Sequence, residues 1–475
     1  MTQDLAPGIE QWLLFDEFEE DYVLESIRGE VPQWIRGSYY LNGPARFRRG
    51  EIDYQHWLDG DGMVRALHFD EQGVRFVSRW VRTRKLEQEE SQGRAVFRTF
   101  GTHFEGDRLR RGVMLEPPVN VSIYTLGSRL LAFAEQSIPY ELDPHTLETR
   151  GEFDFGGRLN EVSPFAAHAK LDPVKNVMVN FGISFSATNP RLYLYEFDTN
   201  GTLLGRRGFP LEAPHTNHDF AITQHFALFF LSPLELDFER FWGEGLSVME
   251  SLSWRPEKES CILGVPRVGC SLPSFRIPRR GGHCLHLINA FEREDRLYLD
   301  LIEFSNPIYP QYQPVPNFYQ SIDPGHPVRY VVDPKQGELL ECRPMQYDRS
   351  PDFPSVDSRR VGKPYTDFWM LGISQAGRAG RKFFDQLVRG DWDEGAVRDV
   401  YSCASGRYLG GEPVHIPHPA DDSAGAILIQ EYDSATDTTS FLIFDSARIS
   451  AGPIAHLPLR NKTHPGFHAS FHSRH

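Results

Sequence analysis

Four histidines of this chain stand among apolar or small residues, where an unpaired imidazole is costly because a buried polar group needs a partner. They are His168 in SPFAAHAKLDP, His218 in HTNHDFAIT, His286 in GGHCLHLINAFE and His468 in HPGFHASF. Imidazole nitrogen suits iron, zinc, copper or nickel rather than calcium or magnesium. We therefore predict that these four side chains, although distant in the sequence, meet at one metal ion.

The number of open positions on the metal separates two kinds of site. A tetrahedral zinc ion held by four histidines would have no free position, whereas a six-coordinate iron ion would keep two for oxygen and a substrate. Four histidines that support chemistry therefore favour iron.

A simpler interpretation of each histidine remains open at this point. The chain has 18 histidines, and any one of them is more often a surface or hydrogen-bonded core residue than a ligand. We interpret seven others as non-ligands, because they lie in polar loops, next to proline or near the C-terminus: His215, His283, His415, His418, His464, His472 and His475.

The elements that must position these side chains are predicted to be β-strands. From residue 31 onward, short extended segments such as residues 37–47 and 74–86 alternate with Gly, Pro, Asn and Asp, and long stretches of helical period are few. This pattern predicts an all-β fold. Strand, turn, strand units recur in residues 130–155, 191–209, 328–344 and 426–445.

Hairpins at such intervals are typical of a β-propeller, although these repeats are too divergent to give a blade number. The inner strands of a propeller converge on its axis, so histidines from several blades can reach one point. We expect residues 1–475 to form one domain, with residues 1–30 as an N-terminal arm. Residues 238–260 and 308–327 lack a strand pattern and are expected to cover one face.

The motif Asp59-Gly60-Asp61-Gly62 is similar to the start of a calcium-binding loop. It lacks the later acidic positions and the flanking helices of such a loop. We interpret it as a tight turn.

Composition limits the partners and the compartment. The chain has 50 Lys+Arg against 65 Asp+Glu, a net charge of −15, and no dense basic cluster, so nucleic acid is not an expected partner. The cysteines are odd in number and show no C-x-x-C spacing, which suits a reducing cytoplasm. The acidic N-terminus does not look like a signal peptide, and no stretch approaches the ~20 apolar residues of a membrane span. A cytoplasmic protein, soluble or peripherally membrane-associated, is expected.

Several motifs in order resemble the carotenoid cleavage oxygenase family over nearly the whole chain. They include GSYYLNGPARF, HWLDGDGM, LLAFAEQSIPYELDPHTLE, AAHAKLDP, NHDFAIT, HLINAFE, DFPSVDSRRVGKPY, GEPVHIPHP and GFHASF. The resemblance implies a seven-bladed β-propeller, with a dome of loops and helices over a non-haem Fe(II) bound by four histidines. Those ligand positions correspond to His168, His218, His286 and His468.

The family also places three glutamates behind the ligands, each hydrogen-bonded to an imidazole. The matching positions in this chain are Glu135, Asp352 and Glu412. Such carboxylates would fix the ring orientations, raise ligand basicity and offset the metal charge. Asp352 is one methylene shorter than the usual glutamate, so we expect its hydrogen bond to be longer or water-mediated.

Two further positions concern the pocket for substrate and O₂. Val121 stands where many family members carry threonine near a vacant iron position, and its methyl groups are expected to restrict that position to a small ligand such as O₂. Ala134 stands where stilbene-cleaving relatives carry a lysine that grips a phenol, so its identity favours a polyene substrate.

The resemblance implies a dioxygenase that cleaves a conjugated C=C bond of a carotenoid or apocarotenoid with O₂ to give two aldehyde or ketone products. A stilbene-cleaving dioxygenase of the same family is the alternative. A branch that isomerises and hydrolyses retinyl esters without O₂ is disfavoured, since the chain lacks the cysteine-containing palmitoylation signature. From a different class, a non-catalytic propeller scaffold is disfavoured by the retention of all four histidine positions.

A polyene substrate dissolves in membranes, so an apolar entrance patch is expected. The candidate is residues 226–242, which begin at Phe226 and end at Trp242. For its first half, as far as Leu231, a buried strand is an equal expectation. The sequence indicates neither the double bond that is cleaved nor the oligomeric state.

Overall fold

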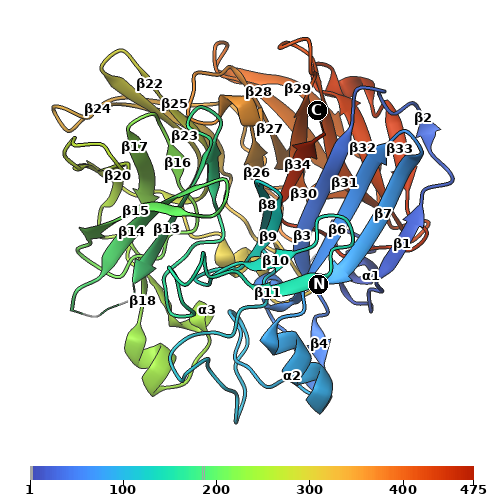
Figure 1. Cartoon of the computed structure of the whole chain (residues 1–475), viewed down its shortest axis with the longest axis horizontal. Helices are drawn as coiled ribbons and strands as arrows, with labels where there is room; N and C mark the ends of the chain where they lie inside the picture. The colour runs from blue at the N-terminus through green and yellow to red at the C-terminus, as the bar shows by residue number, and fades with distance from the viewer. Residues whose placement is uncertain (1–3, 185, 187, 475) are drawn as a thin grey trace.

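Seven antiparallel sheets stand around a common axis in the computed structural model, which describes residues 4–184, 186 and 188–474 (Figure 1). The prediction of an all-β propeller is confirmed, and the blade number of seven implied by the resemblance is the number of these sheets. We number the blades along the ring and give the strands of each from the axis outward.

Blades one to four take the first part of the chain and its last strand. Blade one contains β34 (Ala469–Ser473), β3 (Gly37–Ala45), β6 (Asp61–Asp70), β7 (Gly73–Trp80) and β1 (Glu20–Val23). Blade two contains β8 (Ser122–Leu126), β9 (Arg129–Phe133), β10 (Tyr140–Leu142) and β11 (Thr149–Glu152). Blade three contains β12 (Lys170–Asp172), β13 (Val177–Ser184), β14 (Arg191–Asp198) and β15 (Leu203–Pro210). Blade four contains β16 (Ala221–Ile222), β17 (Phe226–Leu231), β20 (Ser260–Pro266) and β21 (Phe275–Arg279).

Blades five to seven complete the ring. Blade five contains β22 (His283–Arg293), β23 (Arg296–Phe304), β24 (His326–Asp333) and β25 (Glu338–Pro344). Blade six contains β26 (Asp352–Ser355), β27 (Asp367–Gly372), β28 (Gln386–Asp391) and β29 (Ala396–Ser402). Blade seven contains β30 (Arg407–Pro417), β31 (Gly425–Asp433), β32 (Thr438–Asp445), β33 (Ala455–Pro458) and β2 (Arg28–Gly29).

The two ends of the chain close the ring within blade one. Strand β34 pairs antiparallel with β3, with Leu41 opposite Ala469 and Gly37 opposite Ser473. The described part of the predicted N-terminal arm, residues 4–30, packs on the propeller. It holds helix α1 (Ile9–Leu13), the outer strand β1 paired with β7, and β2 paired with β33.

Burial decides the sequence pattern of each strand. In β17 every residue is buried, because its two faces pack against blades three and five. In the outer strand β15 the burial alternates along the chain. Of the two expectations for Phe226 to Leu231, the buried strand is therefore the observed one, and those residues are not exposed at the surface. Trp242 is 44% exposed, whereas Leu234, Leu236 and Phe241 are buried, so the predicted patch reaches the surface only near its end.

Loops and short helices gather at one end of the propeller, at the bottom of Figure 1, where α2 (Arg84–Gln92), α3 (Val248–Ser251) and the ribbon of β4 (Arg48–Arg49) lie. The prediction of a strand over residues 74–86 was wrong at its end. Strand β7 stops at Trp80, and α2 begins after Thr83, whose Oγ1 accepts a hydrogen bond from the backbone nitrogen of Leu86.

The two predicted covering segments contain short elements of their own. Residues 238–260 hold the π-helix η2 (Glu239–Gly243), α3 and β19 (Leu252–Trp254), which pairs with β18 (Leu234–Leu236). Residues 308–327 hold the 3₁₀-helix η3 (Tyr309–Tyr312) and run into β24 at His326. The remaining short elements are β5 (Ile52–Asp53), η1 (Trp57–Asp59), η4 (Ser358–Arg360) and η5 (Ile449–Ala451).

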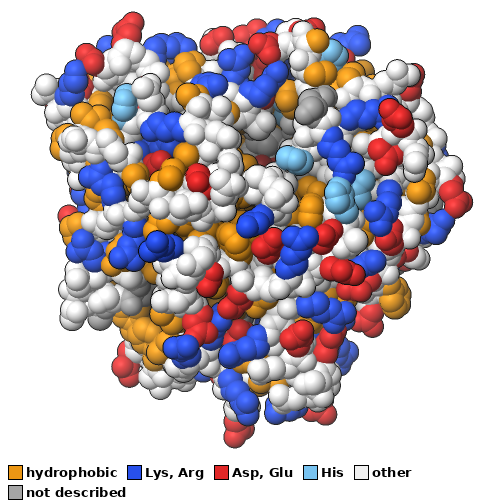
Figure 2. Space-filling model, viewed as in Figure 1, with side chains coloured by type: hydrophobic (Ala, Val, Ile, Leu, Met, Phe, Trp, Pro, Cys, Tyr) orange, Lys and Arg blue, Asp and Glu red, His pale blue; other side chains and the backbone are white. Residues whose placement is uncertain are grey.

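Charged side chains are mixed on the face seen in Figure 2, where Lys and Arg alternate with Asp and Glu without a large area of one sign. Among the residues described, no helix has the length and apolar character needed to cross a membrane.

Candidate metal centre

The four predicted ligands stand at the same end of four inner strands. His168, His218 and His468 lie one to three residues before β12, β16 and β34, and His286 lies near the start of β22. They come from blades three, four, one and five. Converging inner strands thus bring together residues that are far apart in the chain.

Their ring nitrogens form one compact group. One nitrogen from each of the four buried rings lies within 4.8 Å of the other three. The Nε2 atoms of His168 and His218 are 2.9 Å apart, and those of His218 and His286 are 3.2 Å apart. The ring of His468 stands 4.3 Å from that of His168, nearly perpendicular to it.

The three predicted carboxylates lie on the outer side of these rings. Nδ1 of His286 is 2.5 Å from Oδ1 of Asp352, and Nδ1 of His468 is 3.1 Å from Oε2 of Glu412. Nδ1 of His218 is 2.5 Å from Oε1 of Glu135, in ion-pair contact although not aligned as a hydrogen bond. Three of the four rings therefore have a carboxylate at Nδ1.

The expectation of a long or water-mediated contact for Asp352 was wrong. Its backbone explains why, because the register between β26 and β27 shifts after Asp352, and Phe353 has a positive φ of 50°. Bulges of this kind re-aim side chains beside functional sites. The second oxygen, Oδ2, accepts a hydrogen bond of 2.8 Å from the hydroxyl of Tyr312, which belongs to the covering segment 308–327.

A fourth acid, Asp219, was missed by sequence reasoning. Its Oδ1 lies 3.7 Å from Nδ1 of His168 and 2.7 Å from Nζ of Lys170. Its Oδ2 accepts a hydrogen bond from the backbone nitrogen of Leu287 on the neighbouring inner strand. The only sequence signal was an acid directly after His218, a position that gives no indication of the ring it approaches.

The electrostatics favour the uncharged form of two of the rings and the charged form of a third. Burial lowers the pKa values of His168 and His468 well below the ordinary value, and the neighbouring imidazoles lower them further. Burial also opposes protonation of His218, but Glu135 outweighs it and raises the pKa of that ring.

The donor set fits a metal ion. A carboxylate beside Nδ1 favours the neutral tautomer whose proton is on Nδ1, and in that tautomer Nε2 of the same ring keeps a lone pair. Lone pairs of His218 and His286 would then face each other at 3.2 Å with no proton between them. A bound cation removes this conflict, and the carboxylates behind the rings offset part of its charge.

The two predicted pocket residues lie in different surroundings. The backbone oxygen of Val121 accepts a hydrogen bond from the backbone nitrogen of His468, so Val121 stands at the edge of the metal centre. Ala134 is buried in the apolar layer between blades one and two, together with Tyr140 and Leu142. The structure thus places Val121, but not Ala134, in contact with a ligand residue.

The predicted non-ligands that the structure describes lie outside the group of four, and His475 is outside the described residues. His464 is buried against Glu17, His215 lies against the backbone oxygen of Ser232, and His415 stacks on Trp369. His283 departs from the expectation of a surface or hydrogen-bonded residue. It opens β22, is buried, and neither of its ring nitrogens has a hydrogen-bond partner among the described residues.

Comparisons with known proteins agree along the whole chain. A family profile described as RPE65, retinal pigment epithelial membrane protein, matches residues 14–473. The chain is 30% identical to apocarotenoid-15,15'-oxygenase of Synechocystis over 470 residues, which cover 95% of this chain and 94% of the relative. It is 29% identical to isoeugenol monooxygenase of Pseudomonas putida, over 94% of each chain. The crystal structure of cobalt-substituted Synechocystis ACO superposes with a TM-score of 0.91 at 29% identity, covering 99% of this chain and all of the other.

Proposed function

The chain belongs to the RPE65 family, and on this premise we propose that it is a non-haem Fe(II)-dependent oxygenase that cleaves a conjugated C=C bond of a carotenoid or apocarotenoid with O₂. The products are two aldehyde or ketone fragments. The observation that carries this proposal is the group of four buried imidazoles whose nitrogens lie within 4.8 Å of one another. Fe(II) bound there would supply the activation of O₂.

The contribution of the chain is to hold and orient these rings. Asp352 and Glu412 fix the orientation of His286 and His468 through Nδ1, and Glu135 does the same for His218 by ion-pair contact. Among the described residues the group contains these four histidines and no fifth ligand, which suits an ion with open positions.

Apolar side chains exclude water from the same place. The ring of Phe353 lies 5.5 Å from that of His286 and 5.3 Å from that of His468. Trp57 packs against Phe353 and against Tyr312 of the covering segment. Such walls suit a hydrocarbon substrate better than a charged one.

Iron analysis and product analysis test the proposal together. The protein loaded with Fe(II) should consume O₂ and release aldehydes when mixed with an apocarotenal, as detected by mass spectrometry. Anaerobic samples and metal-free protein should release none. An iron-loaded sample that is inert towards a broad panel of polyenes would contradict the proposal.

Cleavage of an aryl alkene is the second candidate, because one similar relative is named isoeugenol monooxygenase. The identity of Ala134 argues against a lysine-gripped phenol, but this residue lies in the layer between two blades. Parallel assays with resveratrol, isoeugenol and an apocarotenal separate the two substrate classes.

Peripheral membrane contact is the remaining part of the proposal. The exposed Trp242 stacks on Phe238 at 5.0 Å, at the end of the molecule that carries the covering segments. Flotation with liposomes should decrease for Phe238→Asp and Trp242→Asp, and equal flotation would refute membrane contact at this point.

A further inference from the structure

His283 and Trp254 present unpartnered nitrogens next to each other in the interior. His283 is 3% exposed, and neither Nδ1 nor Nε2 has a hydrogen-bond partner within the described part of the chain. Nε1 of Trp254 is also buried without a partner there. The two rings stand 6.1 Å apart and nearly perpendicular. Buried polar groups without partners are rare in folded proteins, so three nitrogens in one place need an explanation.

This pair lies beside the metal centre, on its covered side. His283 is three residues before the ligand His286 on the inner strand β22. The Cα atoms of the two residues are therefore at most about 10 Å apart. Its ring is also 6.2 Å from that of Tyr309 in the covering segment 308–327. Trp254 comes from the other covering segment, residues 238–260.

The register of β22 allows both histidines to face this region. A shift lies between Cys284 and Leu287, so the strict alternation of faces is broken around His286. Leu285 and Ile288 pack in the core that also contains Tyr309, whereas Cys284 and Leu287 pack towards blade four.

We propose that His283 and Trp254 bind an oxygen atom of the substrate, which is therefore a conjugated alkene with a hydroxyl or carbonyl group close to the double bond that lies at the metal centre. This inference rests on the proposed function and narrows its substrate class. It also assigns a role to a histidine that its sequence context had placed among the non-ligands.

The hydrogen-bonding capacity of the pair matches such an oxygen. Burial, together with a smaller contribution from the ring of His218, lowers the pKa of His283 to about 3, so the imidazole is neutral and offers one donor and one acceptor. The indole of Trp254 offers one donor. A hydroxyl accepts from the indole and donates to the imidazole, and a carbonyl accepts from both. A hydrocarbon would leave the nitrogens unpartnered, and sites of this kind discriminate strongly against analogues that lack the polar group.

Matched ligands test the proposal without turnover. Binding of 4-hydroxystilbene is compared with that of stilbene, and binding of a short apocarotenal with that of its hydrocarbon analogue, by calorimetry on protein loaded with Co(II). We expect the wild type to prefer the oxygenated member of at least one pair by about 10-fold, the value of one ordinary hydrogen bond. The preferred pair identifies the source of the oxygen.

His283→Phe and, independently, Trp254→Phe should reduce this preference to below about 3-fold while the bound metal stays at the wild-type level. His283→Gln, which keeps a donor and an acceptor, should restore part of it. The control His415→Phe alters a buried histidine of blade seven whose Nδ1 also lacks a partner among the described residues, and it should keep the full preference.

Equal binding within both pairs by the wild type, or an unchanged preference in both His283→Phe and Trp254→Phe, would overturn the proposal. Failure of the proposed function gives a different result. In that case the Fe(II)-loaded protein releases no product from any probe, while the preference measured with Co(II) and its loss in the variants remain.

Discussion

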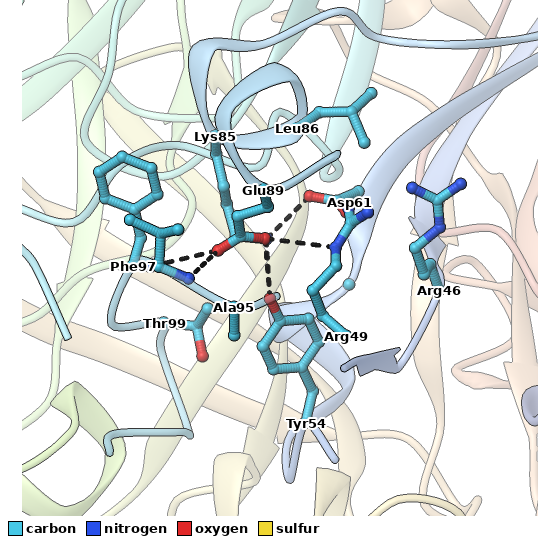
Figure 3. Close-up of polar contacts among 12 residues, drawn as sticks. Arg46, Arg49, Tyr54, Asp61, Lys85, Leu86, Glu89, Ala95, Phe97 and Thr99 are labelled. Atoms are coloured by element: carbon cyan, nitrogen blue, oxygen red, sulfur yellow. Dashed lines mark hydrogen bonds and ion pairs between the residues drawn. The ribbon is translucent and has the colours of Figure 1, made fainter. Parts of the chain in front are cut away.

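Two groups of buried polar side chains in this protein differ in whether the chain itself supplies their hydrogen-bond and ion-pair partners. The metal centre brings together four rings whose Nε2 atoms face one another. The second group, which we call the ion cluster, lies under α2 and is drawn in Figure 3. It consists of Arg49, Tyr54, Asp61, Lys85 and Glu89.

Each member of the ion cluster has partners within the chain. Nζ of Lys85 is 2.8 Å from Oδ1 of Asp61 and 3.1 Å from Oε2 of Glu89, and Arg49 lies 2.5 Å from the other oxygen of Asp61. The hydroxyl of Tyr54 donates to Glu89. Two cations and two carboxylates balance, so the cluster needs no ligand.

The difference teaches where a ligand is required. A buried network whose donors and acceptors are paired makes the structure specific, whereas one with facing lone pairs demands an external cation. The ion cluster accordingly holds backbone in place, since Oε1 of Glu89 accepts hydrogen bonds from the backbone nitrogens of Val96 and Phe97. In the metal centre, by contrast, the rings are held in an arrangement that requires a bound cation.

In the motif Asp59-Gly60-Asp61-Gly62, which is similar to a calcium loop, both carboxylates have partners within the chain. Asp61 is neutralised by Lys85 and Arg49, and Asp59 accepts hydrogen bonds from Gly101 and Thr102. These contacts link the motif to residues 101–102 and to α2. The interpretation of this motif as a turn agrees with these contacts, because both acids are already occupied by donors from the chain.

Removing a ligand should have the largest effect. We expect His286→Ala to eliminate bound iron and turnover, as measured by metal analysis and O₂ consumption. The unfolding free energy of the metal-free protein should change by less than about 1 kcal/mol, because the substitution also removes a facing lone pair. The exposed His103→Ala serves as the control and should bind iron normally. Retention of iron by His286→Ala would contradict the four-ligand centre.

Breaking the ion cluster should give the opposite pattern. Lys85→Met leaves two buried carboxylates with one cation, and we expect a loss of about 3 to 5 kcal/mol in unfolding free energy. Metal content and turnover per folded molecule should stay unchanged. The matched control is Lys335→Met, which removes a contact of the same 2.8 Å length to Asp295, but at the surface. Its unfolding free energy, measured with urea, should change by less than about 0.5 kcal/mol. Equal losses of unfolding free energy in the two variants would mean that burial does not strengthen the contacts of Lys85.

A smaller effect is expected from Tyr312, a residue of the covering segment that contacts the metal centre. Tyr312→Phe removes the hydrogen bond to Oδ2 of Asp352, which in turn orients His286. We expect metal affinity to fall about 10-fold, with a shift in the visible absorption of the Co(II)-loaded protein. Tyr39→Phe is the control, since its buried hydroxyl has no partner among the residues described. Unchanged affinity and spectrum in Tyr312→Phe would mean that Asp352 is held without the covering segment.

The sequence was sufficient to identify the residues of the metal centre, but it was not sufficient to predict how they contact one another. His286 stands out because an imidazole in an apolar strand needs a partner, and the ordered motifs placed Asp352 behind it. The close approach of Asp352 depends on a register shift and a positive φ at Phe353, which no alternation of residue types reveals. Neither could spacing show that Asp219 approaches His168 rather than the adjacent His218.

The same limit hid the ion cluster and His283. Lys85 and Glu89 read as ordinary surface charges, since their partners Asp61 and Arg49 come from other elements. His283 follows two glycines and therefore resembles a loop residue, but the structure makes it the first residue of β22. Burial of polar side chains is a tertiary property, so a single strand pattern could not predict these partners.

The smallest effect concerns Glu431 on β31, a buried carboxylate that is only half satisfied. Its Oε1 lacks a partner among the described residues, and its Oε2 lies 3.6 Å from Arg407. Burial raises the pKa of Glu431 to about 7, although Arg407 opposes the shift. The folded protein thus binds this proton more tightly than the unfolded chain, so the carboxylate lowers the unfolding free energy as pH rises from about 4.5 to about 7.

Glu431→Gln should remove this dependence, because the amide does not ionise. We expect the variant to gain stability relative to the wild type as pH rises from 5 to 8, and to be the more stable of the two at pH 8. Urea unfolding across this range measures the difference, in which contributions from other titrating groups cancel. A difference that stays constant with pH would mean that Arg407 neutralises Glu431 as completely as Lys85 neutralises Asp61. Glu431 would then be a paired carboxylate like those of the ion cluster.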